Sequence, residues 1–178
     1  MEEIYLPEYL DLEALKRELY KYNKKMAILI SCTKRKLKYK AKAEKMYSKS
    51  PVFRKKLLLA QKIVPKEKIF VLSAKHGLIS LEKEIEPYDL SMKQKNKEEK
   101  NQWGMKIVNQ LEKIFGNQMN EHLFLVLAGR DYYEPLVKNE KLKKKILIFF
   151  PKNFGNGKRH QYLNKLLNIE RKSKQKKS

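Results

Sequence analysis

The chain has 178 residues, enough for one ordinary domain with a hydrophobic core. Its 42 Lys and Arg against 20 Asp and Glu give a net charge of +22, which indicates attraction to nucleic acid or anionic membranes, although a Lys-rich proteome would also raise the Lys count; of these we expect a nucleic acid or nucleotide partner and no membrane. A single Cys excludes an intramolecular disulfide, and the sequence predicts no metal site, cofactor, signal peptide, membrane span or obligate protein partner, so we expect a cytoplasmic protein.

Periodicity divides the chain into a helical start, four strands and further helices. Residues 1–25 predict an amphipathic N-terminal helix that starts after Pro7 and packs on the domain, and four apolar runs predict buried strands at Met26–Ser31, Lys68–Ser73, His122–Ala128 and Lys145–Phe150. Helices are expected from Ser50-Pro51 to about Val64, over about 94–115 with Gly116 as the stop, from Asp131 as a cap to about Val137, and from Gly157 to Asn168.

The remaining segments have weaker signals. Ala74–Met92 has no clear period and predicts a long functional loop, while residues 170–178 predict a disordered basic tail. The inward stripes of the two longest helices are expected to be Phe53, Leu57, Leu58 and Ala60, and then Trp103, Ile107, Leu111, Ile114 and Phe115.

The alternation of strands and helices predicts an α/β fold over residues 26–169. We expect a three-layer domain with a mainly parallel sheet, helices on both faces and the extra N-terminal helix. Because ligands bind where parallel strands end, the polar motif after each strand is expected to face one crevice.

The first post-strand motif joins a thiol to a basic loop. Cys32 lies beside cations that lower the pKa of a thiol, so it is a candidate nucleophile, and alternatively a small buried apolar residue. Lys34, Arg35 and Lys36 are candidate phosphate ligands, or else a solvated basic turn.

The second group lies between residues 75 and 89. Lys75 and His76 follow a strand, and His76 is a candidate acid or base or a hydrogen-bonded loop residue. Tyr88 is a candidate base-stacking residue. Asp89 is a candidate catalytic carboxylate for N-glycosidic cleavage, or alternatively a helix cap.

The third motif follows the third strand. Gly129 would let the backbone approach a ligand, and Arg130 is a candidate bidentate phosphate ligand. Tyr132 and Tyr133 are candidates for base stacking, with core packing expected for at least one of them.

Several segments together resemble a known family. Ala27–Lys36, Leu72–Leu78, Glu86–Leu90 and Leu127–Leu136 resemble, in order and spacing, an uncharacterised bacterial and phage domain family related to the peroxide-stress protein YaaA. The similarity covers roughly residues 26–167. The relation to YaaA implies DNA binding and protection against oxidative damage, although His76 and Asp89 stand where YaaA has a tyrosine and a basic residue. The fold also resembles glycosylase-like domains of tRNA-base-modifying enzymes.

These observations lead to one main hypothesis and two alternatives. The main hypothesis is an enzyme directed at nucleic acid or nucleotides that cleaves an N-glycosidic bond, with Asp89 as the carboxylate. The first alternative is a non-catalytic DNA-binding protein of the stress response, and the second is a redox-responsive protein that uses Cys32.

Overall fold

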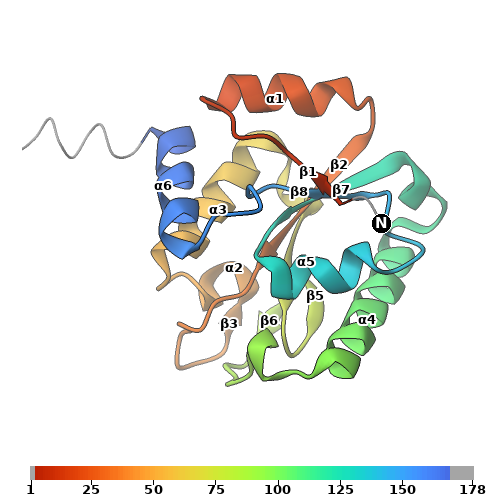
Figure 1. The fold of residues 1–178 in the computed structure, drawn as a ribbon. Helices are drawn as coiled ribbons and strands as arrows, with labels where there is room; N and C mark the ends of the chain where they lie inside the picture. Colours follow the sequence, from red (N-terminus) through yellow and green to blue (C-terminus); the bar gives the residue numbers. More distant parts are fainter. Residues whose placement is uncertain (1–2, 169–178) are drawn as a thin grey trace, which may run out of the picture.

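A six-stranded, mostly parallel sheet runs through the middle of the protein in the computed structural model, which describes residues 3–168 (Figure 1). Its order is β1-β8-β7-β2-β4-β5, and only β5 runs antiparallel to its neighbour. The strands are β1 (Ile4–Tyr5), β2 (Lys25–Ser31), β4 (Ile69–Ser73), β5 (Gly77–Ser80), β7 (His122–Leu127) and β8 (Ile146–Ile148). The four strands predicted from apolar runs are confirmed, with small differences at their ends.

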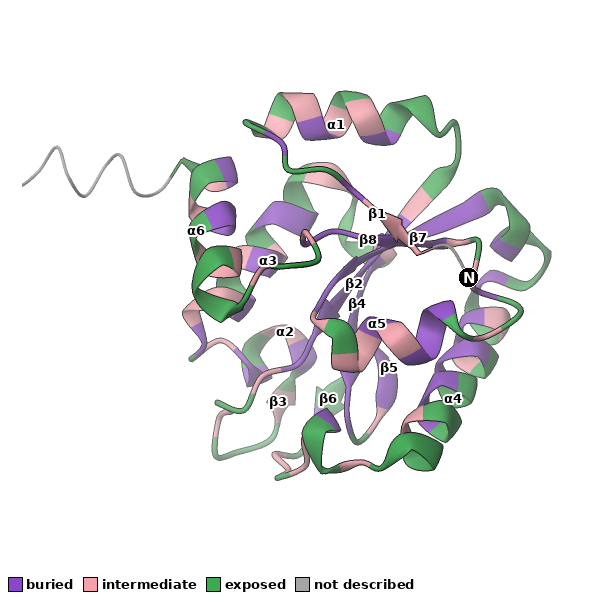
Figure 2. Ribbon diagram, in the orientation of Figure 1, coloured by how far each residue is buried: buried purple, intermediate pink, exposed green. Residues whose placement is uncertain are grey.

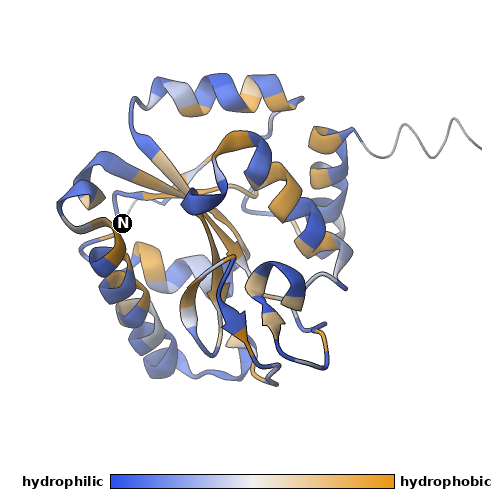
Figure 3. Cartoon of the chain, turned by 180° about the vertical axis from the view of Figure 1, so that it is seen from behind, coloured by the Kyte–Doolittle hydropathy of each residue, from blue (hydrophilic) through white to orange (hydrophobic). Residues whose placement is uncertain are grey.

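The central strands are buried because helices cover both faces of the sheet. All residues of β4, β7 and β8 are buried, as are the last five of β2 (Figure 2). A parallel strand covered on both faces carries a continuous apolar run, which is the pattern that predicted these strands. Seen from behind, the strands are largely hydrophobic, whereas the outer helix surfaces are mostly hydrophilic (Figure 3).

The helices form two outer layers, so the predicted three-layer α/β fold is confirmed. Right-handed crossovers place α1 (Leu12–Lys21) and α3 (Pro51–Ile63) on one face, where α6 (Asn156–Leu167) packs against α3. On the other face lie α4 (Lys97–Phe115) and α5 (Arg130–Val137), which pack against each other (Figure 1).

The main helix boundaries follow local chemistry that the sequence shows. The Ser50 hydroxyl accepts a hydrogen bond from the Phe53 amide at 3.2 Å, which caps α3 ahead of Pro51. Asn96 and Glu99 form a reciprocal capping box at the start of α4. This helix ends at Gly116, whose φ of +53° suits glycine.

Some local predictions were wrong. The N-terminal segment forms a shorter helix than expected and also adds β1 to the edge of the sheet. Asp131 does not cap α5, because Gly129 occupies the N-cap and the Asp131 carboxylate instead binds Lys100 at 2.9 Å. Leu58 and Ile114 are 41% and 52% exposed, since each lies on the outer side of its helix stripe.

The segment 74–92 is more ordered than a long loop. It contains β5, β6 (Glu84–Ile85) and the start of the 3-10 helix η2 (Met92–Gln94). Gly77, with φ of +74°, begins β5 after a tight turn that returns the chain along β4. Short strands joined by a tight turn show little periodicity in the sequence, so the pattern missed them.

A small antiparallel pair lies beside the main sheet. It joins β3 (Ala41–Lys42) to β6, and α2 (Ala43–Met46) follows β3 directly. The 3-10 helices η1 (Lys66–Lys68) and η3 (Gly116–Glu121) lead into β4 and β7. The predicted tail at residues 170–178 lies outside the described residues. Over residues 3–168, no helix combines the length and apolar character that crossing a bilayer requires.

Candidate functional site

The candidate site lies where β2, β4 and β7 end. From β2 the chain passes through α3 to β4 on one side, whereas β7 lies on the other side of β2. From β7 the chain passes through α5 to β8, away from β2, so the crossover direction reverses between β2 and β7, and ligands of open α/β sheets bind at such a switch point. The segments that follow these strands begin with Cys32, Ala74 and Ala128.

A cluster of hydroxyl groups centres on Tyr88. The Tyr88 hydroxyl lies 2.7 Å from the Ser73 hydroxyl and 2.8 Å from the Tyr47 hydroxyl. Ser73 ends β4, Tyr47 follows α2, and Tyr88 lies in the segment after β6, so the β3–β6 pair brings the two tyrosines together. Burial is the main cause that raises the pKa values of Tyr47 and Tyr88, so both phenols are protonated at neutral pH.

Cys32 faces this cluster and contacts a third tyrosine. Its Sγ lies 3.3 Å from the Tyr132 hydroxyl, and only 7% of Cys32 is exposed. Burial raises the pKa of Tyr132, and the adjacent Cys32 raises it further. We call Cys32, Tyr47, Ser73, Tyr88 and Tyr132 the tyrosine cluster.

Trp103 of α4 connects the two sides of the tyrosine cluster. Its indole N–H donates to the Ser73 carbonyl oxygen at 2.8 Å, and its ring centre lies 6.0 Å from that of Tyr132. The end of β4 and the first turn of α5 are therefore both held against the same buried side chain.

One basic residue of the β2–β3 connection lies at the rim of the tyrosine cluster. The Lys36 ammonium lies 4.5 Å from the centre of the Tyr88 ring, a cation–π contact. Lys34 and Arg35 are exposed. The predicted phosphate-binding loop thus adjoins an aromatic face.

His76 also packs against Tyr88. The two ring centres are 5.4 Å apart in an edge-to-face arrangement, and the His76 amide donates to the Ser73 hydroxyl at 3.0 Å. Burial lowers the pKa of His76, and Lys75 lowers it further, so the imidazole is neutral at pH 7. Its Nε2 is buried and has no hydrogen-bond partner among the described residues.

The two other predicted residues of this region lie nearer solvent. Lys75 is exposed and lines, with His76, a cavity of about 520 Å³ beside β5. Asp89 is exposed and follows Tyr88 directly, at the rim of the tyrosine cluster. It does not cap the next helical turn, because Ser91 does so.

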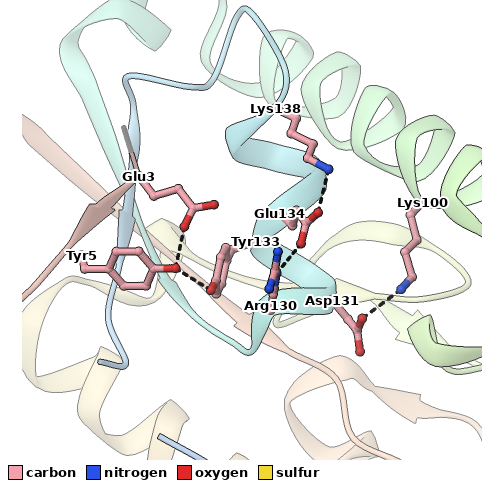
Figure 4. A network of polar contacts seen from close by, with 8 residues as sticks. All are labelled: Glu3, Tyr5, Lys100, Arg130, Asp131, Tyr133, Glu134 and Lys138. Carbon is pink, nitrogen blue, oxygen red and sulfur yellow. Dashed lines mark hydrogen bonds and ion pairs between the residues drawn. The ribbon is translucent and has the colours of Figure 1, made fainter. Parts of the chain in front are cut away.

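Arg130 and Tyr133 take part in a separate polar network (Figure 4). The Arg130 Nε donates to Glu134 at 2.5 Å, and Arg130 lines a cavity of about 370 Å³ that contains neither His76 nor Asp89. Tyr133 is 6% exposed, and its hydroxyl lies 2.8 Å from that of Tyr5. Consecutive residues of a helix point about 100° apart, so Tyr132 reaches Cys32 while Tyr133 packs toward β1.

The comparison with family models gives one match. Residues 27–165 match a family of unknown function, DUF6884. The chain belongs to this family. A search of the curated proteins and a search of the solved structures each found no match. The predicted membership of an uncharacterised family is thus confirmed, and the relation to YaaA stays a prediction.

Part of the predicted set lies together in this DUF6884 domain, but the set does not line one cavity, because His76 and Arg130 line different ones. Cys32, Tyr88 and His76 lie in or against the tyrosine cluster, with Lys36 and Asp89 at its rim. Arg130 and Tyr133 lie apart from it because Glu134 and Tyr5 bind them. Among residues 3–168, no three His, Cys, Asp or Glu side chains are grouped so that they could hold a metal ion.

Sequence reasoning missed a buried cation of the DUF6884 domain next to this cluster. Lys56 of α3 is 7% exposed and donates a hydrogen bond to the Ser31 hydroxyl at 2.8 Å. Its signal in the sequence is a lysine within the inward stripe, three residues after Phe53 and four before Ala60. Tyr47, Ser73 and Trp103 were also not predicted as site residues.

Proposed function

We propose that this DUF6884 domain is an enzyme directed at nucleotides or nucleic acid that cleaves an N-glycosidic bond and releases a base. The observation that supports the proposal best is the tyrosine cluster at the switch point, with the Lys36 ammonium against its Tyr88 ring. A cluster of titratable groups with shifted pKa values at the end of a sheet is typical of active sites. Aromatic faces next to Lys suit a base and its phosphate.

The roles follow from the positions of the groups. The Tyr88 ring would stack on the base. Lys36, whose ammonium contacts this ring in the structure, would turn away from it and bind the phosphate. Asp89 at the rim would stabilise the positive charge that develops on the sugar as the bond to the base breaks. Neutral His76 would accept a proton from the attacking water, while Lys75 lies next to it.

The test is release of free base from nucleosides, nucleotides, DNA and RNA, measured by chromatography. We expect Asp89→Asn to lower the rate by at least about a hundredfold, since an amide cannot provide the charge. Because Ser91 caps η2, the same change should leave the free energy of unfolding within about 0.5 kcal/mol of wild type.

Glu86→Gln is the matched control, because Glu86 is an exposed carboxylate of the same segment. It should leave the rate unchanged. Full activity of the Asp89→Asn protein would remove Asp89 from the mechanism, and no base release from any substrate by the wild type would contradict the proposal.

The second candidate is a non-catalytic DNA-binding protein of the stress response, related to YaaA. The net charge of +22 and the exposed Lys34 and Arg35, which precede Lys36 directly, favour it. Leu72–Leu78 and Glu86–Met92, which resemble elements of YaaA, are joined in this fold by the bond between Ser73 and Tyr88. DNA binding and protection of DNA from peroxide damage without base release would favour this candidate. In both, the expected location is the cytoplasm.

A further inference from the structure

Lys56 is a buried cation without a counter-charge. Its ammonium has the Ser31 hydroxyl as a partner at the end of β2, and no ion pair of Lys56 is found within residues 3–168. A buried ammonium is unfavourable unless an anion or several hydrogen bonds compensate it. Burial accordingly lowers the pKa of Lys56 to about 8, and the charge of Arg159 adds to this effect.

Arg159 of α6 brings a second positive charge to the same place. Its guanidinium lies 5.7 Å from the centre of the Phe150 ring, and the Lys56 ammonium lies 5.9 Å from the same centre. The Arg159 Nε is buried and has no hydrogen-bond partner among the described residues. Within that part of the chain, Arg159 has no ion pair with a carboxylate, so two adjacent cations are uncompensated.

The backbone at the start of α5 completes this group. A methyl group on Gly129 would lie 2.8 Å from Arg159 Nη1, so the guanidinium rests directly on the Gly129 backbone. Gly129 is the N-cap of α5, and no side chain caps this helix end. A helix N-terminus attracts anions through its free N–H groups and its dipole.

We propose that Ser31, Lys56, Gly129 and Arg159 form a subsite for the phosphate group of a phosphate monoester. The subsite lies at the ends of β2 and β7, beside Cys32, which directly follows Ser31. The assignment to a nucleotide rests on the proposed function, whereas binding of phosphate itself does not. Arg159 is only partly buried and would move outward to admit the ligand.

Charge and burial select this ligand class. A phosphate monoester carries about −1.5 to −2 charges at pH 7 and so compensates both cations, whereas a carboxylate compensates one. Lys56 is 7% exposed, so a phosphate that reaches it must enter end-on. A terminal phosphate has one ester link and can do so, but an internal phosphodiester has a chain leaving on both sides. The expected ligands are nucleoside monophosphates and phosphorylated strand ends.

The test is calorimetric binding of inorganic phosphate, nucleoside monophosphates, unphosphorylated nucleosides and short oligonucleotides with or without a 5′-phosphate. We expect the phosphorylated ligands to bind and to lose affinity about tenfold or more in Lys56→Met and in Arg159→Gln. Lys62→Met is the matched control on the exposed side of α3 and should bind like wild type. Gly129→Ala should also weaken binding, because its methyl group meets Arg159.

The outcomes separate this subsite from the proposed function. Equal affinity of wild type and Lys56→Met, or no binding of any phosphorylated ligand, would overturn the subsite, even if base release is observed. Phosphate binding that depends on Lys56 and Arg159, without base release, would support the subsite and contradict the enzyme. If Lys56→Met does not fold, Arg159→Gln alone decides, since Arg159 is partly exposed.

Discussion

His122 is a buried histidine whose neighbours fix its neutral form. No part of it is exposed, its Nδ1–H donates to the Gln118 carbonyl oxygen at 2.8 Å, and its Nε2 accepts from the Lys68 ammonium at 2.8 Å. Protonation would place a second cation beside Lys68. Burial accordingly lowers the pKa of His122 below its usual value of 6.5, and Lys68 contributes to this shift.

This arrangement predicts that acid destabilises the protein through His122. Because the folded-state pKa is lowered, the unfolded chain binds the proton first once the pH falls below about 6.5, so the stability present above that pH is lost on acidification. The loss from one such proton is at most about 1.4 kcal/mol per pH unit. Urea unfolding at about pH 7.5 and about pH 5.5 would measure it.

His122→Gln is the informative variant, since its amide can bond to both Lys68 and the Gln118 carbonyl without titrating. It should lose less stability than wild type over the same range. His76→Gln serves as the comparison, because the pKa of His76 is lowered as well. An acid effect that His122→Gln leaves unchanged would show that other groups cause it.

At the scale of elements, close packing of α4 on α5 positions the tyrosine cluster. Gly104 of α4 is buried, and a methyl group there would lie 2.9 Å from the Pro135 carbonyl oxygen of α5. The same pair of helices carries Trp103 and Tyr132, which contact each other at the site. The absence of a side chain at residue 104 therefore sets how near the start of α5 comes to Cys32.

We predict that Gly104→Ala destabilises the protein. Replacing Gly by Ala inside a helix usually gains up to about 1 kcal/mol, but overpacking against a backbone atom costs about 1–3 kcal/mol, and the second effect should prevail. Thermal and urea unfolding would measure the change. Met105→Ala, at an exposed neighbouring position, should stay within about 0.5 kcal/mol, and a more stable Gly104→Ala protein would contradict this account.

The strands and helix ends could be predicted from the sequence, whereas the contact between Tyr47 and Tyr88 could not. Runs such as Ala27–Ile30 are apolar because helices cover both faces of the sheet, so the sequence could predict both the strands and their burial. Helix starts such as Ser50 and stops such as Gly116 have local causes and were also predictable. The bond between Tyr47 and Tyr88 depends on the β3–β6 pair, whose two-residue strands leave no period to detect.

The candidate site residues also differ in whether the sequence alone could predict them. Cys32, His76 and Tyr88 were predictable because each belongs to a motif after a strand or to the segment that follows it. Lys56 and Arg159 come from the inner sides of two helices, and only their meeting at Phe150 makes them a pair. Arg130 is the opposite case. Its position after β7 predicted a ligand-binding residue, but Glu134, one helical turn away, forms an ion pair with it.

At the scale of the whole molecule, the charge of +22 and the two edges of the sheet define a testable interface. Lys34 and Arg35 are exposed after β2, at the carboxyl edge that holds the tyrosine cluster. Lys62 near the end of α3 and Lys144 before β8 are exposed at the opposite edge. Each pair contributes the same charge, so the pairs differ in location alone.

We predict salt-dependent binding of DNA or RNA with little sequence preference, located at the carboxyl edge. Bound phosphates release counterions, so affinity should fall steeply between about 50 mM and about 200 mM salt. Removing both charges in Lys34→Gln/Arg35→Gln should weaken binding and reduce the salt slope by roughly one for each phosphate that the variant no longer neutralises. Lys62→Gln/Lys144→Gln should change the affinity and the salt slope less, because the charges that it removes act only through the long-range field, which salt screens within about 10 Å.

Anisotropy titrations over a salt series measure the affinity and the salt slope of each variant. Equal reductions in the two double variants would mean that the net charge attracts nucleic acid without a defined interface, and undetectable binding at about 50 mM salt would contradict a nucleic acid partner and leave free nucleotides as the ligand class.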